Sequence, residues 1–305
     1  MDAIQKGLLE RLADLHEVPE GAYNIRTNGG LGGRNTTANI DIISKEDKPG
    51  IDIIIKPDTK KESVHIPVII SESGLHDMVY NDFYIGENAD VTIVAGCGIH
   101  NCGDQDSSHD GIHTFHVGKN AKIKYVERHY GEGEGTGANI MNPETVIYID
   151  EGGYLEMETT QIKGIESTIR KTTATLGNEA KLVIKESLMT HGKQFAKTDF
   201  TVDLNGENSS ANVISRSVAK DESYQEFYSN IRGNNKCAGH TECDAILMDK
   251  ARVVAIPEIS ANHIDASLIH EAAIGKIAGE QLIKLMSLGL TEQEAEEQIV
   301  NGFLK

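Results

Sequence analysis

The residues best suited to chemistry are cysteines and histidines, and the denser of their two clusters spans residues 97–116. This cluster contains two thiols and four imidazoles, namely Cys97, His100, Cys102, His109, His113 and His116. Thiolate and imidazole ligands together suit zinc, copper or iron–sulfur chemistry, so the composition favours a metal site. The spacing does not match a zinc finger. A turn-rich corner with hydrogen-bonded histidines is therefore an open alternative, alongside a mononuclear zinc site.

The second cluster is thinner and lies nearer the C-terminal end of the chain. Its members are Cys237, His240, Cys243, His270 and Glu271. The last two do not form the H-E-x-x-H motif of a zinc protease, because Ile274 stands where the second histidine is needed. A cysteine such as Cys243 is more often a small buried apolar residue than a ligand. Composition alone therefore leaves the role of this cluster open.

The four cysteines form two close pairs in the sequence. Whether such pairs are disulfides or free thiols depends on the cell compartment. The first ten residues lack the basic and then apolar order of a signal peptide, and no stretch approaches about 18 consecutive apolar residues. We therefore expect a cytoplasmic protein without a membrane span. In a reducing compartment, cysteines serve as thiols, metal ligands or redox groups more often than as structural disulfides.

The charge balance restricts the classes of partner and substrate. The chain has 305 residues, with 29 Lys and Arg against 47 Asp and Glu, which gives a formal net charge of −18. Nucleic-acid binding needs clustered cations to neutralise phosphates, so this balance argues against it. Aromatic residues make up 5% of the chain and Trp is absent. That composition disfavours a carbohydrate-active β-helix enzyme, which would stack sugars on aromatic rings.

A repeated phrase between residues 40 and 260 indicates the element that positions both clusters. Each copy is an apolar residue, a Gly-centred turn, a small residue and an alternating strand, and the copies begin at Ile85, Val117, Ile149 and Leu176. Strand-only units that recur every 20–50 residues are typical of a stacked solenoid, in which neighbouring coils bury one continuous core. A β-propeller is the alternative, but it needs about four strands per blade. The spacing therefore predicts a mainly β fold of the β-helix type.

Different patterns flank the repeats. Residues 3–16 have apolar side chains at three- and four-residue spacing, which predicts an amphipathic helix. The Gly-rich run 28–33 lacks the G-K-[ST] ending of a phosphate-binding loop, so we interpret it as a flexible turn. The sequence predicts two further helices, at residues 280–289 and 291–303. The second begins with the capping box Thr291-Glu-Gln-Glu294. The second helix is rich in glutamate, so we expect this helical hairpin to dock on a protein rather than on DNA.

The C-terminal sequence resembles the signature of the SufB/SufD family, the scaffold subunits of the Suf iron–sulfur cluster assembly machinery. The resemblance rests on Cys243-Asp-Ala-Ile-Leu-Met, Ile256-Pro-Glu-Ile, His270-Glu-Ala-Ala-Ile-Gly-Lys-Ile and the ending from Gln281 to Ala295 with Gly302-Phe-Leu. The run Gly98-Ile-His-Asn-Cys-Gly-Asp, with His109-Asp-Gly-Ile-His after it, is similar to the shorter SufB-like members. The resemblance covers residues 25–305.

This resemblance implies an architecture and a set of partners. The fold would be a right-handed parallel β-helix, with an N-terminal helical segment at 1–24, a β-helix core at 25–262 and a C-terminal helical subdomain at 263–305. A SufC-type ABC ATPase would grip the C-terminal helices, and the chain would pair through its β-helix with a second copy or with a paralogue. No Walker motif occurs in the sequence. The resemblance thus implies a non-enzymatic scaffold for cluster assembly whose partner hydrolyses ATP.

The resemblance also assigns site residues. Cys243 and Glu271 match the cysteine and the carboxylate implicated in cluster assembly in SufB. The first glutamate of the family motif is replaced by Ile269, so His270 becomes the expected substitute ligand. We therefore expect these three, Cys243, His270 and Glu271, to hold iron and a transient iron–sulfur cluster, with two copies of the trio meeting in a dimer. Secondary possibilities are Cys237, as a sulfur relay or an inert thiol, and Cys97, Cys102, His100, His109 and His113.

Overall fold

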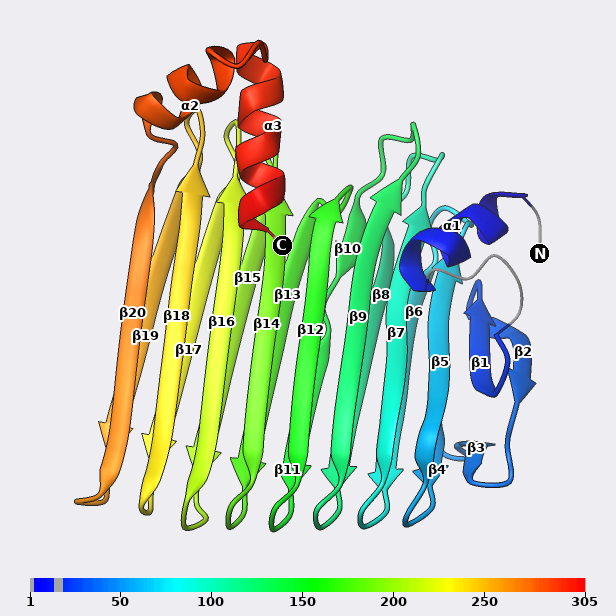
Figure 1. Ribbon diagram of the computed structural model, residues 1–305. Helices are drawn as coiled ribbons and strands as arrows, with labels where there is room; N and C mark the ends of the chain where they lie inside the picture. Colours follow the sequence, from blue (N-terminus) through cyan, green and yellow to red (C-terminus); the bar gives the residue numbers. More distant parts are fainter. Residues whose placement is uncertain (1–2, 14–18, 305) are drawn as a thin grey trace.

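The computed structural model describes residues 3–13 and 19–304, and most of them form two parallel β-sheets that face each other (Figure 1). Successive strands of the chain alternate between the sheets and pair with strands of the neighbouring coils, so the chain winds into a β-solenoid of about eight turns. Each strand pairs in parallel with a strand of the next coil. In a propeller blade, by contrast, strands that are adjacent in the sequence pair with each other. The predicted β-helix is confirmed.

Each sheet has ten strands in its hydrogen-bonded order. The first contains β2 (Gly30–Asn35), β1 (Ala22–Thr27), β5 (Lys60–Ile70), β7 (Asp90–His100), β9 (Lys122–Glu132), β12 (Tyr154–Lys163), β14 (Lys181–Thr190), β16 (Ser209–Ala219), β18 (Cys237–Leu247) and β20 (Ala266–Lys276). The second contains β19 (Arg252–Ala261), β17 (Tyr224–Gly233), β15 (Phe195–Leu204), β13 (Ser167–Leu176), β11 (Glu144–Ile149) with β10 (Asn139–Met141), β8 (Ser107–Val117), β6 (His76–Ile85), β4 (Gly50–Ile55) and β3 (Ile40–Ser44). Two antiparallel hairpins, β1–β2 and β3–β4, close the N-terminal end.

The core lies between the sheets, because every second residue of each strand points inward. One inward row runs through the second sheet, and each member pairs with the next: Ile53, Phe83, Phe115, Ile147, Ala174, Val202 and Ile231. The rings of Phe83 and Phe115 stack with their centroids 4.3 Å apart. Burying a side chain of this size stabilises the fold by about 1.5–3 kcal/mol. The stacked row therefore joins each coil to its neighbours.

The Gly-centred phrase forms the turns at one end of the solenoid. A Cβ at Gly118 would lie 2.6 Å from the carbonyl oxygen of Ile85 in the preceding coil, so only glycine fits there. Asn120 adopts a left-handed φ of 55°, which asparagine tolerates better than most residues. Ala121 is fully buried, and its N–H donates to the carbonyl oxygen of Gly118 at 3.1 Å. These requirements explain why the phrase recurs along the sequence.

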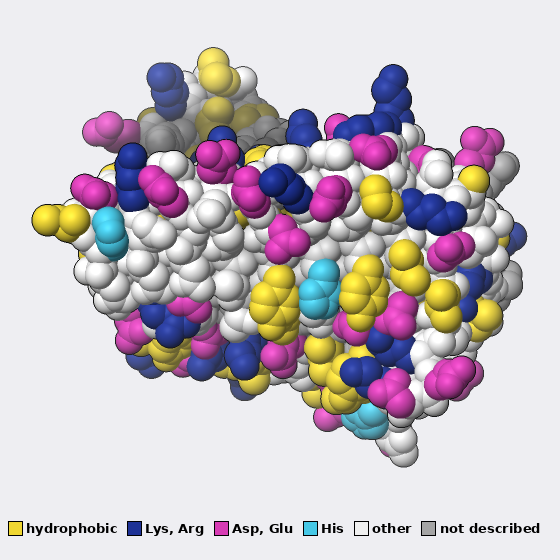
Figure 2. All heavy atoms as spheres, turned by 90° about the horizontal axis from the view of Figure 1, so that it is seen from below, with side chains coloured by type: hydrophobic (Ala, Val, Ile, Leu, Met, Phe, Trp, Pro, Cys, Tyr) yellow, Lys and Arg dark blue, Asp and Glu magenta, His cyan; other side chains and the backbone are white. Residues whose placement is uncertain are grey.

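The same end also carries a stack of rings on its outer surface. Figure 2, a view onto this end, shows a histidine between two hydrophobic side chains near the centre of the face. Tyr84, His116 and Tyr148 come from three successive coils, and their ring centroids lie 5.1 and 5.4 Å apart. The planes are nearly parallel, so the rings cover one another and hold adjacent coils in register.

A short helix covers the N-terminal part of the first sheet. Helix α1 spans Ala3–Ala13 and packs on β5, β7 and β9 through the buried side chains of Leu8 and Leu12. A Cβ at Gly98 would lie 3.1 Å from both leucines, so the bare backbone of β7 lets the helix approach. The helix was expected to reach residue 16, and residues 14–18 lie outside the described part of the chain.

Two helices follow the last strand. Helix α2 spans Gly279–Met286 and α3 spans Glu292–Phe303, with the expected capping box between Thr291 and Glu294. The strands continue to Lys276, so residues 266–276, which were expected in the helical subdomain, form β20. This strand sits at the edge of the sheet and carries apolar residues on both faces, which hides its alternation. Among the described residues, no helix has the length and apolarity that a membrane crossing requires.

Candidate functional site

Cys243 lies inside the last complete coil of the solenoid. It is on β18, where it pairs with Ser215 of β16 on one side and with Ala272 of β20 on the other. Its side chain is 1% exposed and faces the core. Only β20, at the open edge of the first sheet, separates this strand from the end of the solenoid (Figure 1). The thiol is therefore buried but only one strand from the edge.

His270 lies on the same face as Cys243. It pairs with Thr241, two residues before the cysteine, and alternate residues of a strand share a face. The Oγ1 atom of Thr241 is 2.5 Å from Nδ1 of His270, which fixes the orientation of the ring. Burial, with a further contribution from His240, lowers the pKa of His270 below its usual value. The imidazole is therefore neutral at pH 7 and is a competent metal ligand.

Glu271 lies on the opposite, outward face of β20. It pairs with Glu242, and its Oε2 atom is 3.8 Å from Nε2 of His240. Its side chain is 67% exposed. The structure thus brings Cys243 and His270 to one face and leaves Glu271 on the other. Within residues 3–13 and 19–304, no three His, Cys, Asp or Glu side chains are arranged to hold a metal ion.

The environment of Cys243 keeps its thiol protonated in this conformation. Burial raises its pKa to about 12, and the carboxylates of Glu186 and Asp244 contribute to that increase. The Glu186 carboxylate is held within the core by the hydroxyls of Ser215, at 2.7 Å, and Thr198, at 2.9 Å. A thiol must lose its proton to become a nucleophile or a metal ligand. Cys243 therefore needs access to solvent or to a cation before it can act.

A buried ion pair lies further inside the solenoid and was missed from the sequence. The guanidinium of Arg170 donates from Nη1 to Glu127 at 2.6 Å, and its Nε lies 3.7 Å from Glu186. Burial alone would raise the pKa of Glu127, but the charge of Arg170 holds it well below its usual range. Charged residues at inward positions of three strands are the signal that would have revealed this network.

Half of the cluster at residues 97–116, namely Cys97, His109 and His113, is buried in the core. Burial raises the pKa of Cys97 well above its usual value. His113 contacts Asn81 at 3.3 Å and Tyr125 at 3.0 Å, and burial lowers its pKa to about 4. His109 lies 3.3 Å from Asp77. His113 thus has the hydrogen bonds that the alternative interpretation of the cluster expected, and Cys97 and His109 are buried beside it.

The outer part of that cluster forms a separate group at the upper end of β7. Sγ of Cys102 is 3.0 Å from Nε2 of His100, and Nδ1 of His100 is 3.3 Å from Oε1 of Glu132. Burial would raise the pKa of Glu132, but its hydrogen bond from Arg11 lowers it below the usual value. His100 and Cys102 therefore lie apart from the buried His109 and His113, and the four do not form one site.

Cys237 does not reach Cys243. Both lie on β18 and face the core, but six residues separate them, which corresponds to about 20 Å along a strand. Burial raises the pKa of Cys237 above its usual value. One of the two predicted roles for Cys237 was to pass sulfur to Cys243. In this conformation the two thiols are too far apart for a direct transfer.

The burial of the cysteines predicts a simple labelling pattern. We expect an alkylating reagent to modify Cys102 rapidly in the native protein, because this thiol is exposed while Cys97, Cys237 and Cys243 are buried. All four should react once the chain is unfolded in denaturant. Peptide mass spectrometry after timed labelling gives the order of reaction. Labelling of Cys243 as fast as that of Cys102 would contradict the buried placement.

Comparison with known proteins bears on the C-terminal cluster. A family model described as "SUF system FeS cluster assembly, SufBD core domain" matches residues 71–303. An iron–sulfur cluster assembly SufBD family protein of Methanothermobacter thermautotrophicus (strain Winter) is 31% identical over 244 residues, which cover 78% of this chain and 57% of the relative. A SufBD family protein of Methanocaldococcus jannaschii is 30% identical over 255 residues, covering 83% of this chain and 79% of the relative.

A third relative extends over more of the chain. A SufBD family protein of Pyrococcus horikoshii is 27% identical over 278 residues, which cover 89% of this chain and 83% of the relative. The chain matches little more than half the length of the Methanothermobacter relative. The family match includes β18, β20 and both C-terminal helices.

Proposed function

Because this chain belongs to the SufBD family of iron–sulfur cluster assembly proteins, we propose that it is a non-enzymatic scaffold on which a cluster is built and then released. The observation that carries this proposal is the pair Cys243 and His270, which share the inward face beside the open edge of the solenoid. Glu271 lies next to them on the outward face. The cluster is the cargo of the protein, and these three residues are its proposed ligands.

The three proposed ligands suit an iron–sulfur cluster that is bound only temporarily and then released. Thiolate sulfur binds iron strongly, whereas imidazole and carboxylate are harder and weaker ligands for a cluster. A set of one thiol, one imidazole and one carboxylate therefore holds iron less firmly than four thiolates do. All four cysteines of the chain are free, which fits our placement of the protein in the reducing cytoplasm.

A second copy of the chain, or a paralogue, would complete the site. Strands β19 and β20 end their sheets, so each leaves one side of its backbone without a neighbouring strand in the described part of the chain. Exposed apolar side chains accompany this edge: Ile256, Ile259, Ile264, Ile269 and Ile274. An open edge with apolar side chains favours association with another chain. Symmetric pairing there would bring two copies of Cys243, His270 and Glu271 close together.

The C-terminal helices are the proposed docking site for a SufC-type ABC ATPase. Ile283 of α2 is 68% exposed and Leu288, which follows the helix, is 77% exposed. Helix α3 is anchored by Val300 and Leu304, which pack against Val218 of β16. Ile283 and Leu288 thus face outward beside a helix, α3, that is held against the solenoid. We assign ATP hydrolysis to the partner, and its movement would displace β20 and give Cys243 access to iron and sulfur.

Retention of the ATPase tests this proposal. We expect the tagged chain, co-expressed with the SufC-type ATPase of its own organism and purified without oxygen, to retain that ATPase in stoichiometric amount. Introducing Ile283→Asp with Leu288→Asp should abolish retention, because both side chains are exposed and their burial would drive docking. Ile162→Asp, a change at an exposed apolar residue of β12, is the matched control. Equal retention by the double variant would refute docking through α2.

A further inference from the structure

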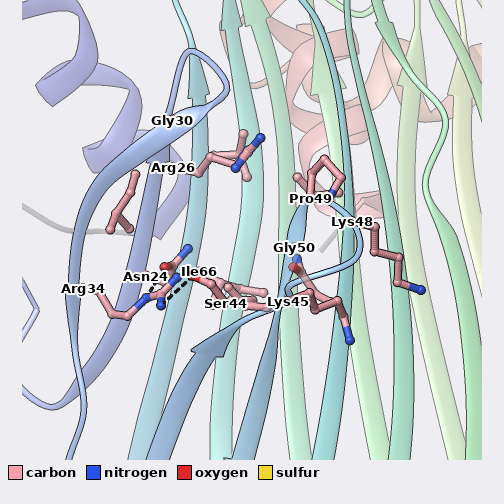
Figure 3. Close-up of a pocket in the computed structure, with 15 residues that line it drawn as sticks. Asn24, Arg26, Gly30, Arg34, Ser44, Lys45, Lys48, Pro49, Gly50 and Ile66 are labelled. Atoms are coloured by element: carbon pink, nitrogen blue, oxygen red, sulfur yellow. Dashed lines mark hydrogen bonds between the residues drawn. The ribbon is translucent and has the colours of Figure 1, made fainter.

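The N-terminal end of the solenoid contains a cavity of about 220 Å³ between the β1–β2 and β3–β4 hairpins (Figure 3). The arginines that line it hold the hairpins in place. Arg34 donates to Oδ1 of Asn24 at 2.8 Å and to Oγ of Ser44 at 3.0 Å. Arg26 pairs with Asp77 at 2.6 Å. Both arginines therefore join the first sheet to the second and close this end of the solenoid.

The Gly-rich run 28–33 belongs to the first of these hairpins. It was expected to be a flexible turn, but only Asn28 and Gly29 turn, and the rest of the run is the first part of β2. Strand pairing with β1 overrides the preference of glycine for turns. The run is therefore mostly a strand that forms one wall of the cavity.

A thiol, an imidazole and a carboxylate form a hydrogen-bonded chain at the upper end of β7. Strand register pairs His100, the last residue of β7, with Glu132, the last residue of β9. Nδ1 of His100 lies 3.3 Å from Oε1 of Glu132, and Nε2 lies 3.0 Å from Sγ of Cys102. A nucleophile beside a base that a third group orients is the arrangement that activates thiols for attack.

The order of the three groups assigns their roles. Burial would raise the pKa of Glu132, but the hydrogen bond from Arg11 lowers it below the usual value, so the carboxylate is ionised at pH 7. An ionised carboxylate only accepts hydrogen bonds, so it faces the Nδ1–H of His100. In this tautomer Nε2 carries the lone pair that faces Sγ of Cys102. His100 is therefore placed to take the proton of the thiol.

Helix α1 fixes the carboxylate from above the first sheet (Figure 1). Arg11, in the last turn of α1, donates to Oε2 of Glu132 and to the hydroxyl of Tyr130. The same hydroxyl donates to Oε2 of Glu132 at 3.2 Å. One oxygen of Glu132 is thus held by Arg11 and Tyr130, and the other is presented to His100.

The loop that carries Cys102 is fixed by the preceding residue. Asn101 is buried, and its Nδ2 donates to the carbonyl oxygens of Gln105 at 2.9 Å and Gly137 at 3.2 Å. Its Oδ1 accepts from the backbone N–H of Gly103 at 3.1 Å. The thiol of Cys102 is exposed, whereas Cys97, Cys237 and Cys243 are buried. A fixed loop therefore presents this one thiol to solvent.

The surface around Cys102 is acidic. Asp104 and Asp106 follow in the same loop, Glu134 lies in the loop of the next coil, and all three are exposed. The two loops are adjacent, because Thr136 donates from its backbone N–H to the carbonyl oxygen of Gly103 at 2.9 Å. The runs 102–106 and 132–136 contain neither Lys nor Arg. A negative surface attracts cationic reactants and repels anionic ones.

We propose that Cys102, His100 and Glu132 form a thiol–disulfide exchange site for small disulfides that carry positive charge. His100 takes the thiol proton as Sγ of Cys102 attacks one sulfur of the disulfide, so that a new S–S bond forms and the old one breaks. The released thiolate then takes the proton from His100. Cys102 is oxidised to a mixed disulfide and the leaving thiol is reduced, so the disulfide itself is the oxidant. This site is independent of the cluster-assembly proposal.

Reaction of the full chain with cystamine at pH 7, followed by mass spectrometry, tests the site. We expect one adduct, on Cys102, which dithiothreitol removes. His100→Gln should lower the rate about tenfold or more, because the thiol loses its base. The matched control is His76→Gln, which changes another exposed histidine, one whose Nδ1 lies 2.9 Å from Oγ of Ser108 on the second sheet. The control should react at the rate of the unaltered chain.

A second reagent tests the charge preference. With rates divided by those of N-acetylcysteine amide, cystamine should react about tenfold faster than the dianion 3,3′-dithiodipropionate at low ionic strength. Added salt should reduce this ratio, since it screens exposed charges. Equal normalised rates would overturn the preference for cationic disulfides. The exchange site itself is overturned if cystamine leaves Cys102 unmodified, or if folded His100→Gln, checked by circular dichroism, reacts as fast as the unaltered chain.

Discussion

Cys243→Ser is expected to lower the iron and acid-labile sulfide retained after anaerobic reconstitution about tenfold or more, because a serine hydroxyl is a hard, poor ligand for a cluster. The change removes the one thiol of the proposed trio, while His270 and Glu271 remain. Serine is close to cysteine in size, and Ser215 and Thr241 already provide hydroxyl groups beside this position. The variant should therefore fold.

The control for this experiment is a second cysteine of the same strand. Cys237→Ser changes a thiol that is buried like Cys243 and faces the same core, but that lies about 20 Å along β18. We expect it to keep most of its iron and sulfide. Absorption of visible light by thiolate–iron bonds, together with chemical analysis of iron and sulfide, measures the difference. Equal loading of Cys243→Ser and the unaltered chain would remove Cys243 from the site.

Arg170→Leu is expected to lower the free energy of unfolding by about 3–5 kcal/mol, because it leaves Glu127 buried without its cation. The Arg170 side chain is 6% exposed and that of Glu127 is 4% exposed, so water cannot replace the lost pairing. The neighbouring residue provides the control. Lys171→Ala removes a 3.7 Å pair with Glu144 on the surface and should cost about 0–1 kcal/mol. Urea denaturation at pH 7 measures both.

The free energy of unfolding of the unaltered chain and that of Arg170→Leu should change with pH in opposite directions. In the unaltered chain the pKa of Glu127 is lowered in the folded state, so its contribution to stability is present above its unfolded pKa and is lost as the pH falls through the folded value. In Arg170→Leu the pKa of the uncompensated carboxyl should be raised by burial, so acid relieves the penalty. The difference in stability should be smaller at pH 5 than at pH 7. A small, pH-independent difference would contradict this account.

The solenoid could be predicted because its turns impose local requirements on sequence. Glycine is needed where Gly118 passes the carbonyl of Ile85, and a small residue such as Ala121 must enter the core directly after the turn. These requirements repeat with each coil, so the phrase and its spacing appear in one sequence. The capping box at Thr291 and Glu294 is equally local, and it was found for the same reason.

The arrangement of the site depends on register between coils, which no local pattern reveals. Pairing of Cys243 with Ala272 places His270 inside and Glu271 outside, although the two residues are adjacent in sequence. The partners Glu127 and Arg170 are 43 positions apart and meet only because the coils stack. The resemblance placed the start of the helical segment at residue 263, whereas the solenoid continues through β20 to Lys276.

The most direct test of the central claim is analysis of metal and sulfide in the chain purified without oxygen from cells that also produce the proposed partner, a SufC-type ATPase of the same organism. The proposal predicts iron and acid-labile sulfide in about equal amounts, since the common clusters contain them equally. It also predicts that both are lost together in Cys243→Ser. Zinc without sulfide, or protein that contains neither iron nor sulfide, would contradict the assignment of this chain as a cluster scaffold.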